Sequence, residues 1–267
     1  MKMLGRLLIK LASLALGSSL LCSSELPAYA EPAIIKSEVS CFAIYKSNVC
    51  DLTIKFIGEI AAVSTETVQS ILDASKARTN WLNKQVRIDS PGGNVDASMA
   101  IGKLLRENRF WISIPKGGRC ASACVLIFAG AVRRTAFGKI GIHRPYLNRG
   151  VNSEPVSPEK VQGGYAEMLN GMRAYLRAMN VSEGLADDML KVAPAEMRYL
   201  SQEDLNNYGL SFVDPVEQET IDLEDARKLG LDRGEYVRRQ AIQKTKCGTL
   251  PFLDLLKCEE RVMKFGR

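Results

Sequence analysis

The chain has 267 residues, of which 36 are basic, 30 are acidic and one is histidine, a composition typical of a soluble globular protein. A single histidine excludes metal sites that need two or more imidazoles, and it makes His143 the one candidate for a histidine general base. The formal net charge of +6 comes without a Lys/Arg block or interleaved aromatic residues, which argues against nucleic-acid binding.

The first 30 residues predict a secretory signal peptide. Three basic residues precede an apolar run that reaches Leu21, and Ala28-Tyr29-Ala30 provides a small-x-small cleavage site. A membrane anchor is the alternative, but the uncharged stretch at residues 11–24 is shorter than the ~20 apolar residues of a spanning helix. A lipoprotein built on Cys22 is disfavoured because Leu21 is bulkier than the residue usual there. We expect export to the periplasm or beyond, with cleavage near Ala30 leaving 33 basic and 29 acidic residues.

Six cysteines remain after that cleavage, an even number that indicates disulfides in an oxidising compartment. Their spacing favours three local pairs: Cys41 with Cys50, Cys120 with Cys124, and Cys247 with Cys258. Other pairings stay open, because spacing alone does not fix connectivity. A zinc site is the alternative reading of the cysteines. The chain has no C-x-x-C motif and one histidine, so we expect no metal site.

The segments that follow alternate between strand and helix patterns. The cysteines before residue 52 flank a short strand and turn at residues 42–45. Apolar, β-branched runs predict strands at residues 52–58, 85–89, 111–114 and 140–143. Apolar residues at helical spacing predict helices at residues 64–79, 95–106 and 122–131. The alternation predicts an α/β domain whose helices cover a largely parallel sheet.

Helical patterns dominate the second half of the chain. A long helix is predicted to open at Ser157-Pro158-Glu159 and run to about residue 179, and a shorter one covers residues 182–192. A capping box at residues 201–204 precedes another helix, and the tail from residue 217 is helical and charged. We therefore predict a signal peptide, a disulfide-containing lead-in, an α/β catalytic domain and a helical C-terminal extension, at residues 1–30, 31–51, 52–215 and 216–267.

Three features between residues 89 and 145 carry groups suited to acyl transfer. A strand ends in Asp89-Ser90-Pro91-Gly92-Gly93, the turn at residues 118–123 leads into an apolar helix, and His143 ends a short strand. Each has a structural alternative, as a tight turn, a helix cap or a structural histidine. Together they supply a nucleophile in Ser122, a base in His143, and oxyanion donors in the backbone N–H groups of Gly93 and Ala123.

These motifs resemble the ClpP-like serine peptidases of the ClpP/crotonase superfamily, to which signal-peptide peptidase SppA also belongs. The similarity spans residues 52–214, and the matching segments are residues 88–95, 118–123 with 128–131, 142–145 and 199–210. The resemblance implies a spiral of strand-strand-helix units, with Ser122 as nucleophile, His143 as base, and the amides of Gly93 and Ala123 as oxyanion hole. A peptide or protein substrate would bind as an extended strand beside the glycine turn.

The resemblance also implies a homo-oligomer, since related peptidases form rings, and it implies no cofactor. A coupled ATPase ring is not expected outside the membrane, where ATP is scarce.

The acidic third member of the catalytic triad departs from the ClpP-type pattern. Met197 stands where that pattern has the acid, and the neighbouring Glu196 would point to the other side of an extended segment. Glu196 is therefore re-aimed by a bulge, or a backbone carbonyl orients His143, or the enzyme is a Ser-His dyad. An inactive homologue is a fourth alternative, because losing the orienting carboxylate can cost ~10⁴ in rate.

The two cysteines around Ser122 lead to a separate hypothesis. Cα atoms at positions i and i+4 of a helix are roughly 6 Å apart, within the range of a disulfide. Oxidation of Cys120 and Cys124 would then clamp the turn that holds Ser122. The alternative is two buried apolar thiols.

The leading functional hypothesis is an exported serine endopeptidase that acts through Ser122 and His143. A catalytically degenerate peptide-binding or scaffold protein is the second, and the methionine at position 197 favours it. A crotonase-type acyl-CoA enzyme is the third. It is disfavoured because its chemistry does not need the Ser-His pairing and because export removes the usual supply of CoA.

Overall fold

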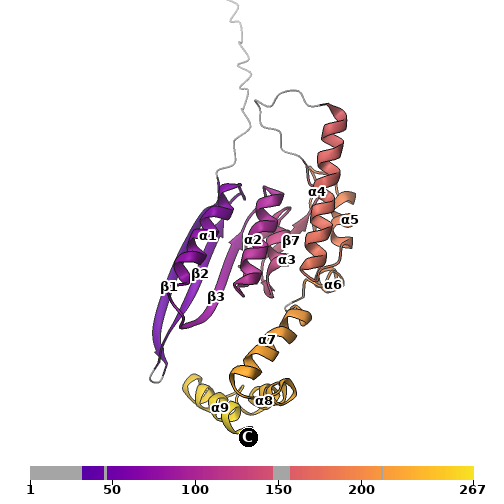
Figure 1. Cartoon of the computed structure of the whole chain (residues 1–267). Helices are drawn as coiled ribbons and strands as arrows, with labels where there is room; N and C mark the ends of the chain where they lie inside the picture. Colours follow the sequence, from indigo (N-terminus) through magenta and orange to yellow (C-terminus); the bar gives the residue numbers. More distant parts are fainter. Residues whose placement is uncertain (1–31, 45–46, 147–156, 212) are drawn as a thin grey trace, which may run out of the picture. The chain divides into compact units, whose positions relative to one another are not determined.

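The computed structural model describes residues 32–44, 47–146, 157–211 and 213–267 (Figure 1). The predicted signal peptide lies outside these residues. Within them, a five-stranded sheet has the order β1-β2-β3-β4-β6. Its strands are β1 (Ile34–Ile44), β2 (Ser47–Ile57), β3 (Trp81–Asp89), β4 (Trp111–Ile114) and β6 (Arg133–Ala136). The β1–β2 pair is an antiparallel hairpin and the other neighbours are parallel, which confirms the predicted α/β class with a largely parallel sheet.

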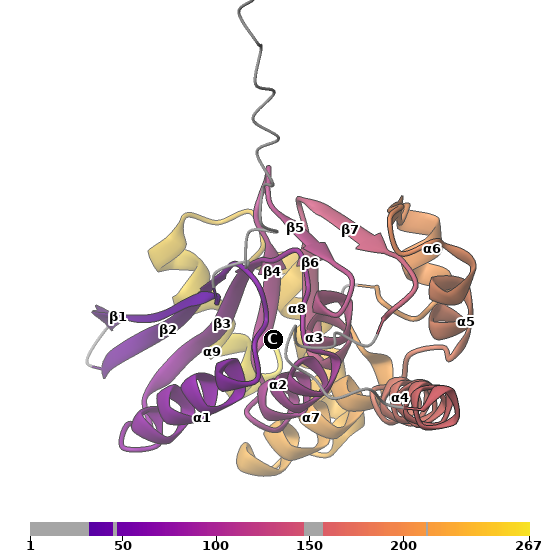
Figure 2. The ribbon, with the colours of Figure 1, turned by 90° about the horizontal axis from the view of Figure 1, so that it is seen from above.

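Two helices cover one face of this sheet. They are α1 (Val63–Ser75) and α2 (Val95–Glu107), which run side by side in Figures 1 and 2. Along β2, alternate residues are buried, as expected for a strand with one face in the core. The side chains of Phe56, Leu72 and Ile101 are each almost fully buried in one continuous core. The apolar periodicity of α1 and α2 is therefore satisfied by packing on the sheet.

A second, smaller sheet has the order β5-β7-β8. Its strands are β5 (Arg119–Ala121), β7 (Lys139–Ile142) and β8 (Arg198–Tyr199), with β5 parallel to β7 and β8 antiparallel to it. Between β5 and β6 runs α3 (Cys124–Gly130), a seven-residue helix in which every residue is buried. Because α3 lies entirely in the core, its first residues are held firmly relative to both sheets.

The remaining helices follow in chain order. They are α4 (Pro158–Ala178), α5 (Gly184–Lys191), α6 (Gln202–Asn207), α7 (Pro215–Lys228), α8 (Arg233–Lys246) and α9 (Phe252–Phe265). Ser201 and Asp204 form the predicted capping box of α6, since each side chain accepts a hydrogen bond from the backbone N–H of the other. The predicted helical character of the tail is confirmed by α7, α8 and α9. None of the helices in the described ranges is long and apolar enough to cross a membrane.

Several element boundaries differ from the sequence prediction. The lead-in contains an eleven-residue strand, β1, rather than a short one, and the predicted boundary after residue 51 falls inside β2. The helix predicted at 64–79 ends at Ser75. The helix predicted from Ser122 begins only at Cys124, so Ser122 precedes the helix and does not belong to it.

Candidate active site

Ser122 occupies a strained turn between β5 and α3. Its φ is +55°, in the left-handed region that residues with a Cβ atom rarely adopt. The N–H of Ser122 donates to the carbonyl of Gly141 at 2.9 Å, and its own carbonyl accepts from Val125 at 3.0 Å. The side chain is half-buried while Ala121 and Ala123 on either side are buried. A serine held in this way between two fixed elements is well placed to act as a nucleophile.

The Pro-Gly-Gly turn after β3 packs directly on this serine turn. Gly92 has φ of +106°, and a Cβ atom there would lie 2.6 Å from both the carbonyl oxygen of Ala121 and the Cβ of Ser122. On its other side the turn is tied to Ile60, whose N–H donates to Gly92 at 2.8 Å. Glycine is required here because no side chain fits between the two turns.

The two predicted oxyanion donors lie on these adjoining turns. Gly93 follows Gly92 and has φ of +139°, and Ala123 is the residue before α3. Within the described part of the chain, neither backbone N–H is paired with a hydrogen-bond acceptor. Unpaired amides at a helix N-terminus and in a glycine turn are suited to bind an anionic oxygen.

His143 comes directly after β7 and is 7% exposed. Its Nδ1 is buried without a hydrogen-bond partner among the described residues. Burial lowers the pKa of the imidazole below its usual value, and a backbone hydrogen bond at Arg144 opposes this to a lesser degree. A neutral imidazole is the form that accepts a proton, so this environment favours His143 as a base.

The pairing of β5 with β7 brings Ser122 and His143 to the same edge of the small sheet. Ala121 is paired with Gly141 in this parallel ladder, and the two side chains of interest follow directly after the two strands. The carboxyl ends of neighbouring parallel strands meet at one edge. Ser122 and His143 therefore follow paired strands at one edge of the small sheet, and Gly93 follows the glycine that packs on residues 121–123.

Glu196 was the candidate for the acidic residue of a catalytic triad, but the strand pairing does not set it opposite His143. Gly141 pairs with Tyr199 and Ile142 with Arg198, so continuation of this antiparallel register sets Met197 opposite His143. A Cβ atom at Gly141 would lie 2.6 Å from the Met197 sulfur. Glu196 is exposed in a turn, and its N–H donates to Ala193 at 2.9 Å.

One contributor to the site escaped the sequence prediction. Gly141 provides the carbonyl that holds Ser122 and the open space that Met197 fills. The available signal was a glycine inside a short apolar strand, which often marks a close approach of another backbone.

Three disulfides join the predicted cysteine pairs in the structure. Their Cα–Cα distances are 4.1 Å for Cys41–Cys50, 5.2 Å for Cys120–Cys124 and 5.7 Å for Cys247–Cys258. The last two distances lie within the usual range for disulfides, and the first is slightly shorter. The second of these bonds brackets Ser122.

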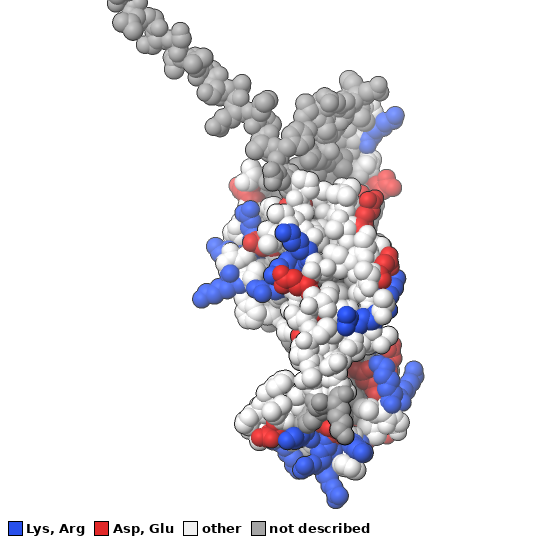
Figure 3. All heavy atoms as spheres, turned by 90° about the vertical axis from the view of Figure 1, so that its left-hand side faces the viewer, with Lys and Arg blue, Asp and Glu red and all other residues white. Residues whose placement is uncertain are grey.

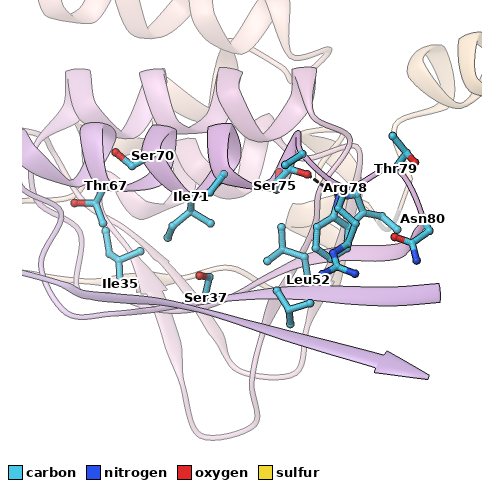
Figure 4. Close-up of a pocket in the computed structure, with 14 residues that line it drawn as sticks. Ile35, Ser37, Leu52, Thr67, Ser70, Ile71, Ser75, Arg78, Thr79 and Asn80 are labelled. Carbon is cyan, nitrogen blue, oxygen red and sulfur yellow. Dashed lines mark hydrogen bonds between the residues drawn. The ribbon is translucent and has the colours of Figure 1, made fainter. Parts of the chain in front are cut away.

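A groove of about 750 Å³ lies elsewhere, between the β1–β2 hairpin and α1 (Figure 4). Its walls combine apolar side chains such as Ile35, Leu52 and Ile71 with hydroxyl groups and the guanidinium of Arg78. Neither Ser122 nor His143 lines it, so this groove is separate from the candidate active site.

Charged side chains of both signs are present on the surface of the molecule. On the face drawn in Figure 3, basic and acidic side chains are scattered among uncharged residues, and Lys and Arg gather toward the lower end of the view. Among the described residues, no group of three or more His, Cys, Asp and Glu side chains is arranged to hold a metal ion.

Comparison with known proteins gives one family match. The family model described as Clp protease matches residues 36–218, more than half of the chain. No curated protein matches the sequence.

Among solved structures, a mutant of the 1510-N membrane-bound stomatin-specific protease is 20% identical, with a TM-score of 0.42 over 58% of this chain and 74% of that chain. A second mutant, in complex with a substrate peptide, is 20% identical, with a TM-score of 0.43 over 62% and 76%. A ClpP1 mutant from Listeria monocytogenes is 19% identical, with a TM-score of 0.47 over 59% and 87%.

Proposed function

The chain belongs to the Clp protease family and has its ClpP/crotonase-like fold, and on this basis we propose that it is an exported serine endopeptidase with Ser122 as nucleophile and His143 as general base. One observation carries the proposal. The N–H of Ser122 is bonded to Gly141, two residues before His143, while the serine itself is held in a left-handed turn ahead of α3. This backbone pairing supports the assignment of Ser122 and His143 to one site.

The proposed reaction proceeds in two acyl-transfer steps. Ser122 Oγ attacks the peptide carbonyl carbon as its proton passes to His143, and the carbonyl oxygen becomes an oxyanion. The N–H groups of Gly93 and Ala123 donate to that oxyanion. The imidazolium then gives its proton to the leaving amine, and an acyl-enzyme remains on Ser122. Water, deprotonated by the same imidazole, releases the acid and restores the serine.

The third member of the triad is absent from this proposal. Met197 follows the register opposite His143 and carries no charge, so we propose a Ser-His dyad whose imidazole is held by burial. Loss of the orienting carboxylate costs up to ~10⁴ in rate in a triad enzyme. We therefore expect slow turnover of peptides and clearer signals from a reactive active-site probe.

A fluorophosphonate probe tests the proposal, because it forms a covalent bond to an activated serine. The purified protein is expected to be labelled at Ser122, and Ser122→Ala to be unlabelled. His143→Ala is expected to slow labelling by about 10³-fold. Ser201→Ala is the matched control, since Ser201 caps α6 and lies outside the site. Labelling that persists in Ser122→Ala would refute the assigned nucleophile.

A noncatalytic peptide-binding protein is the second candidate function. The observation that favours it is Met197, which removes the orienting acid while leaving the glycine turn intact. Absence of probe labelling in folded wild-type protein, together with binding of an extended peptide, would favour this candidate over the peptidase.

Export is part of the proposal and rests on the sequence and the cysteines. The leader with its Ala-Tyr-Ala site supports cleavage near Ala30, and the disulfides at Cys41, Cys120 and Cys247 are stable in an oxidising compartment.

Self-association is proposed on the basis of the family and of β1. Members of this family commonly form oligomers, and β1 is an eleven-residue edge strand with exposed Val39 and Phe42. A long edge strand with exposed apolar side chains favours pairing with another chain. Light scattering after gel filtration would report a mass above that of one chain.

A further inference from the structure

We propose that the Cys120–Cys124 disulfide is a positioning element that holds Ser122 in its reactive backbone conformation, an inference that rests on the proposed function. The bond joins the residues two before and two after the serine, and both cysteines are fully buried. It therefore closes a small ring of backbone around the candidate nucleophile. Neither sulfur is exposed to act as a nucleophile or ligand itself.

The two ends of this bridge belong to different rigid elements. Cys120 lies in β5, where it is paired with Ile140 of β7 and bridged to Ser90. Cys124 is the first residue of the buried helix α3. The bond thus ties the small sheet to the helix, and only three residues lie between the two anchor points.

The middle residue of the three is the one under conformational strain. Ser122 has φ of +55°, and a residue with a Cβ atom keeps such a conformation only where its surroundings enforce it. Hydrogen bonding to Gly141 and packing of Gly92 against residues 121–123 contribute, but both are noncovalent. The disulfide adds a covalent limit on how far β5 and α3 can separate.

Relaxation of this turn would change the proposed chemistry directly. A change of φ at Ser122 rotates its side chain and the N–H of Ala123 together, relative to β5 and the rest of the site. The nucleophile and one oxyanion donor would therefore lose their alignment together. Small displacements of reacting groups have large effects on rate.

The bridge is a weak candidate for general stabilisation. A disulfide stabilises a fold more when it closes a longer loop, and this one joins residues only four apart. Cys247 and Cys258 are eleven apart and join the end of α8 to α9. We therefore expect loss of the Cys120–Cys124 bond to reduce reactivity more than loss of the Cys247–Cys258 bond does. Loss of the Cys247–Cys258 bond is expected to reduce the stability to unfolding more.

The test compares the full chain with Cys120→Val/Cys124→Val and with the control Cys247→Val/Cys258→Val. Labelling by a fluorophosphonate is followed as maximal rate and half-saturating concentration, and hydrogen exchange is measured on peptides covering residues 118–126. For the Cys120/Cys124 variant we expect a maximal rate lower by about tenfold or more with little change in half-saturation. We expect exchange to be faster in those peptides and unchanged elsewhere. The control variant is expected to keep both values within about twofold of wild type while losing more of its thermal stability.

Each outcome decides the proposal. Rates and exchange within about twofold of wild type in the Cys120/Cys124 variant would overturn it. Loss of the whole fold, both in this variant and in Cys120→Ala/Cys124→Ala, would also overturn it, because the bond would then serve the fold rather than the turn. Wild-type protein that is never labelled refutes the proposed peptidase function instead. In that case the exchange of residues 118–126 still decides whether the bond holds the turn.

Discussion

At the scale of single residues, the proposed chemistry depends on a histidine that stays neutral. Burial lowers the pKa of His143, and this outweighs the opposing effect of a backbone hydrogen bond at Arg144. The neutral imidazole, which is the base, is therefore retained as the pH falls through the ordinary histidine range near ~6.5. We expect the acid limb of the labelling rate to have its midpoint below that value.

The pH dependence of fluorophosphonate labelling between about pH 4.5 and 8 measures this midpoint. His143→Ala removes the base, so its residual rate is expected to lose the acid limb. A wild-type midpoint at or above the ordinary value would mean that a negative charge, such as an unassigned carboxylate, faces the imidazole.

A second residue-scale prediction concerns the glycine that packs on Ser122. Gly92→Ala places a Cβ atom 2.6 Å from the Ser122 turn, in addition to the cost of a positive φ. Gly117 is a matched control, since its φ is +83° but a Cβ there meets nothing within 4 Å. We expect Gly92→Ala to lower the free energy of unfolding by more than about 2 kcal/mol and to slow labelling, and Gly117→Ala to cost about 1 kcal/mol with labelling unchanged.

Urea unfolding and probe labelling of the two alanine variants give both quantities. Equal losses in Gly92→Ala and Gly117→Ala would show that backbone conformation alone sets the cost. The close packing of Gly92 against the serine turn would then have no energetic consequence.

Residue types and residue geometry differed in how far they could be predicted. Ser122, His143 and the glycine turn stand out in the sequence because few other residues could perform the chemistry. The left-handed φ of Ser122 and its bond to Gly141 could not be predicted, because both result from the pairing of β5 with β7, which are twenty residues apart at Arg119 and Lys139. The small residues at 121–123 resemble the start of a helix. Helix propensity therefore predicted a helix that begins at residue 122, within the turn, rather than at Cys124.

At the scale of elements, an apolar strand was predicted correctly and a polar strand of the same length was missed. The strand at Trp111–Ile114 is confirmed with its predicted bounds, since apolar residues alternate with others and the segment pairs on both sides. The strand β6 was missed because Arg133 and Arg134 begin it. Arg134 is nonetheless fully buried, and tertiary contacts hold its guanidinium with the carbonyls of Ala131 and Gly209. Such burial of a charged side chain has no signature in local sequence.

The junction between the α/β domain and the helical extension yields a prediction about stability. Asp214 caps α7 and is 1% exposed, and it accepts hydrogen bonds from Arg106 at 2.7 Å and Asn180 at 3.0 Å. Removing one partner of a buried pair leaves an uncompensated charge. We expect Asp214→Ala to lower the free energy of unfolding by about 3–5 kcal/mol. Asp225→Ala, which breaks a partly exposed pair with Lys228, is the control and should cost less than about 1 kcal/mol.

The pH dependence of the same difference provides an independent check. Burial alone would raise the pKa of Asp214, but the hydrogen bonds from Arg106, Asn180 and the backbone outweigh it and lower the pKa. The contribution of Asp214 is therefore present above the ordinary aspartate range near ~3.9 and is lost as the pH falls through the lowered value. A gap between wild type and Asp214→Ala that already closes near neutral pH, measured by urea unfolding, would contradict this account.

At the scale of the whole molecule, the three disulfides and the leader together predict the N-terminus and the thiol content of the mature protein. Cys50, Cys120, Cys124 and Cys247 are fully buried, and each is joined to a cysteine within eleven residues along the chain. Local pairs of this kind form as the chain folds in an oxidising compartment and are then shielded from thiol exchange. We expect protein recovered from that compartment to begin near Glu31 and to carry no free thiol.

Mass spectrometry after alkylation in denaturant, without reduction, measures both properties in one sample. The matched control is the same protein reduced before alkylation, which is expected to gain six alkyl groups, one for each cysteine beyond residue 30. Full-length protein retaining Cys22 would contradict export with cleavage. Alkylation of Cys120 and Cys124 alone would mean that only the other two disulfides form. The proposed positioning of Ser122 would then lose its physical basis, because Gly92 and Gly141 would hold the strained turn without a covalent restraint.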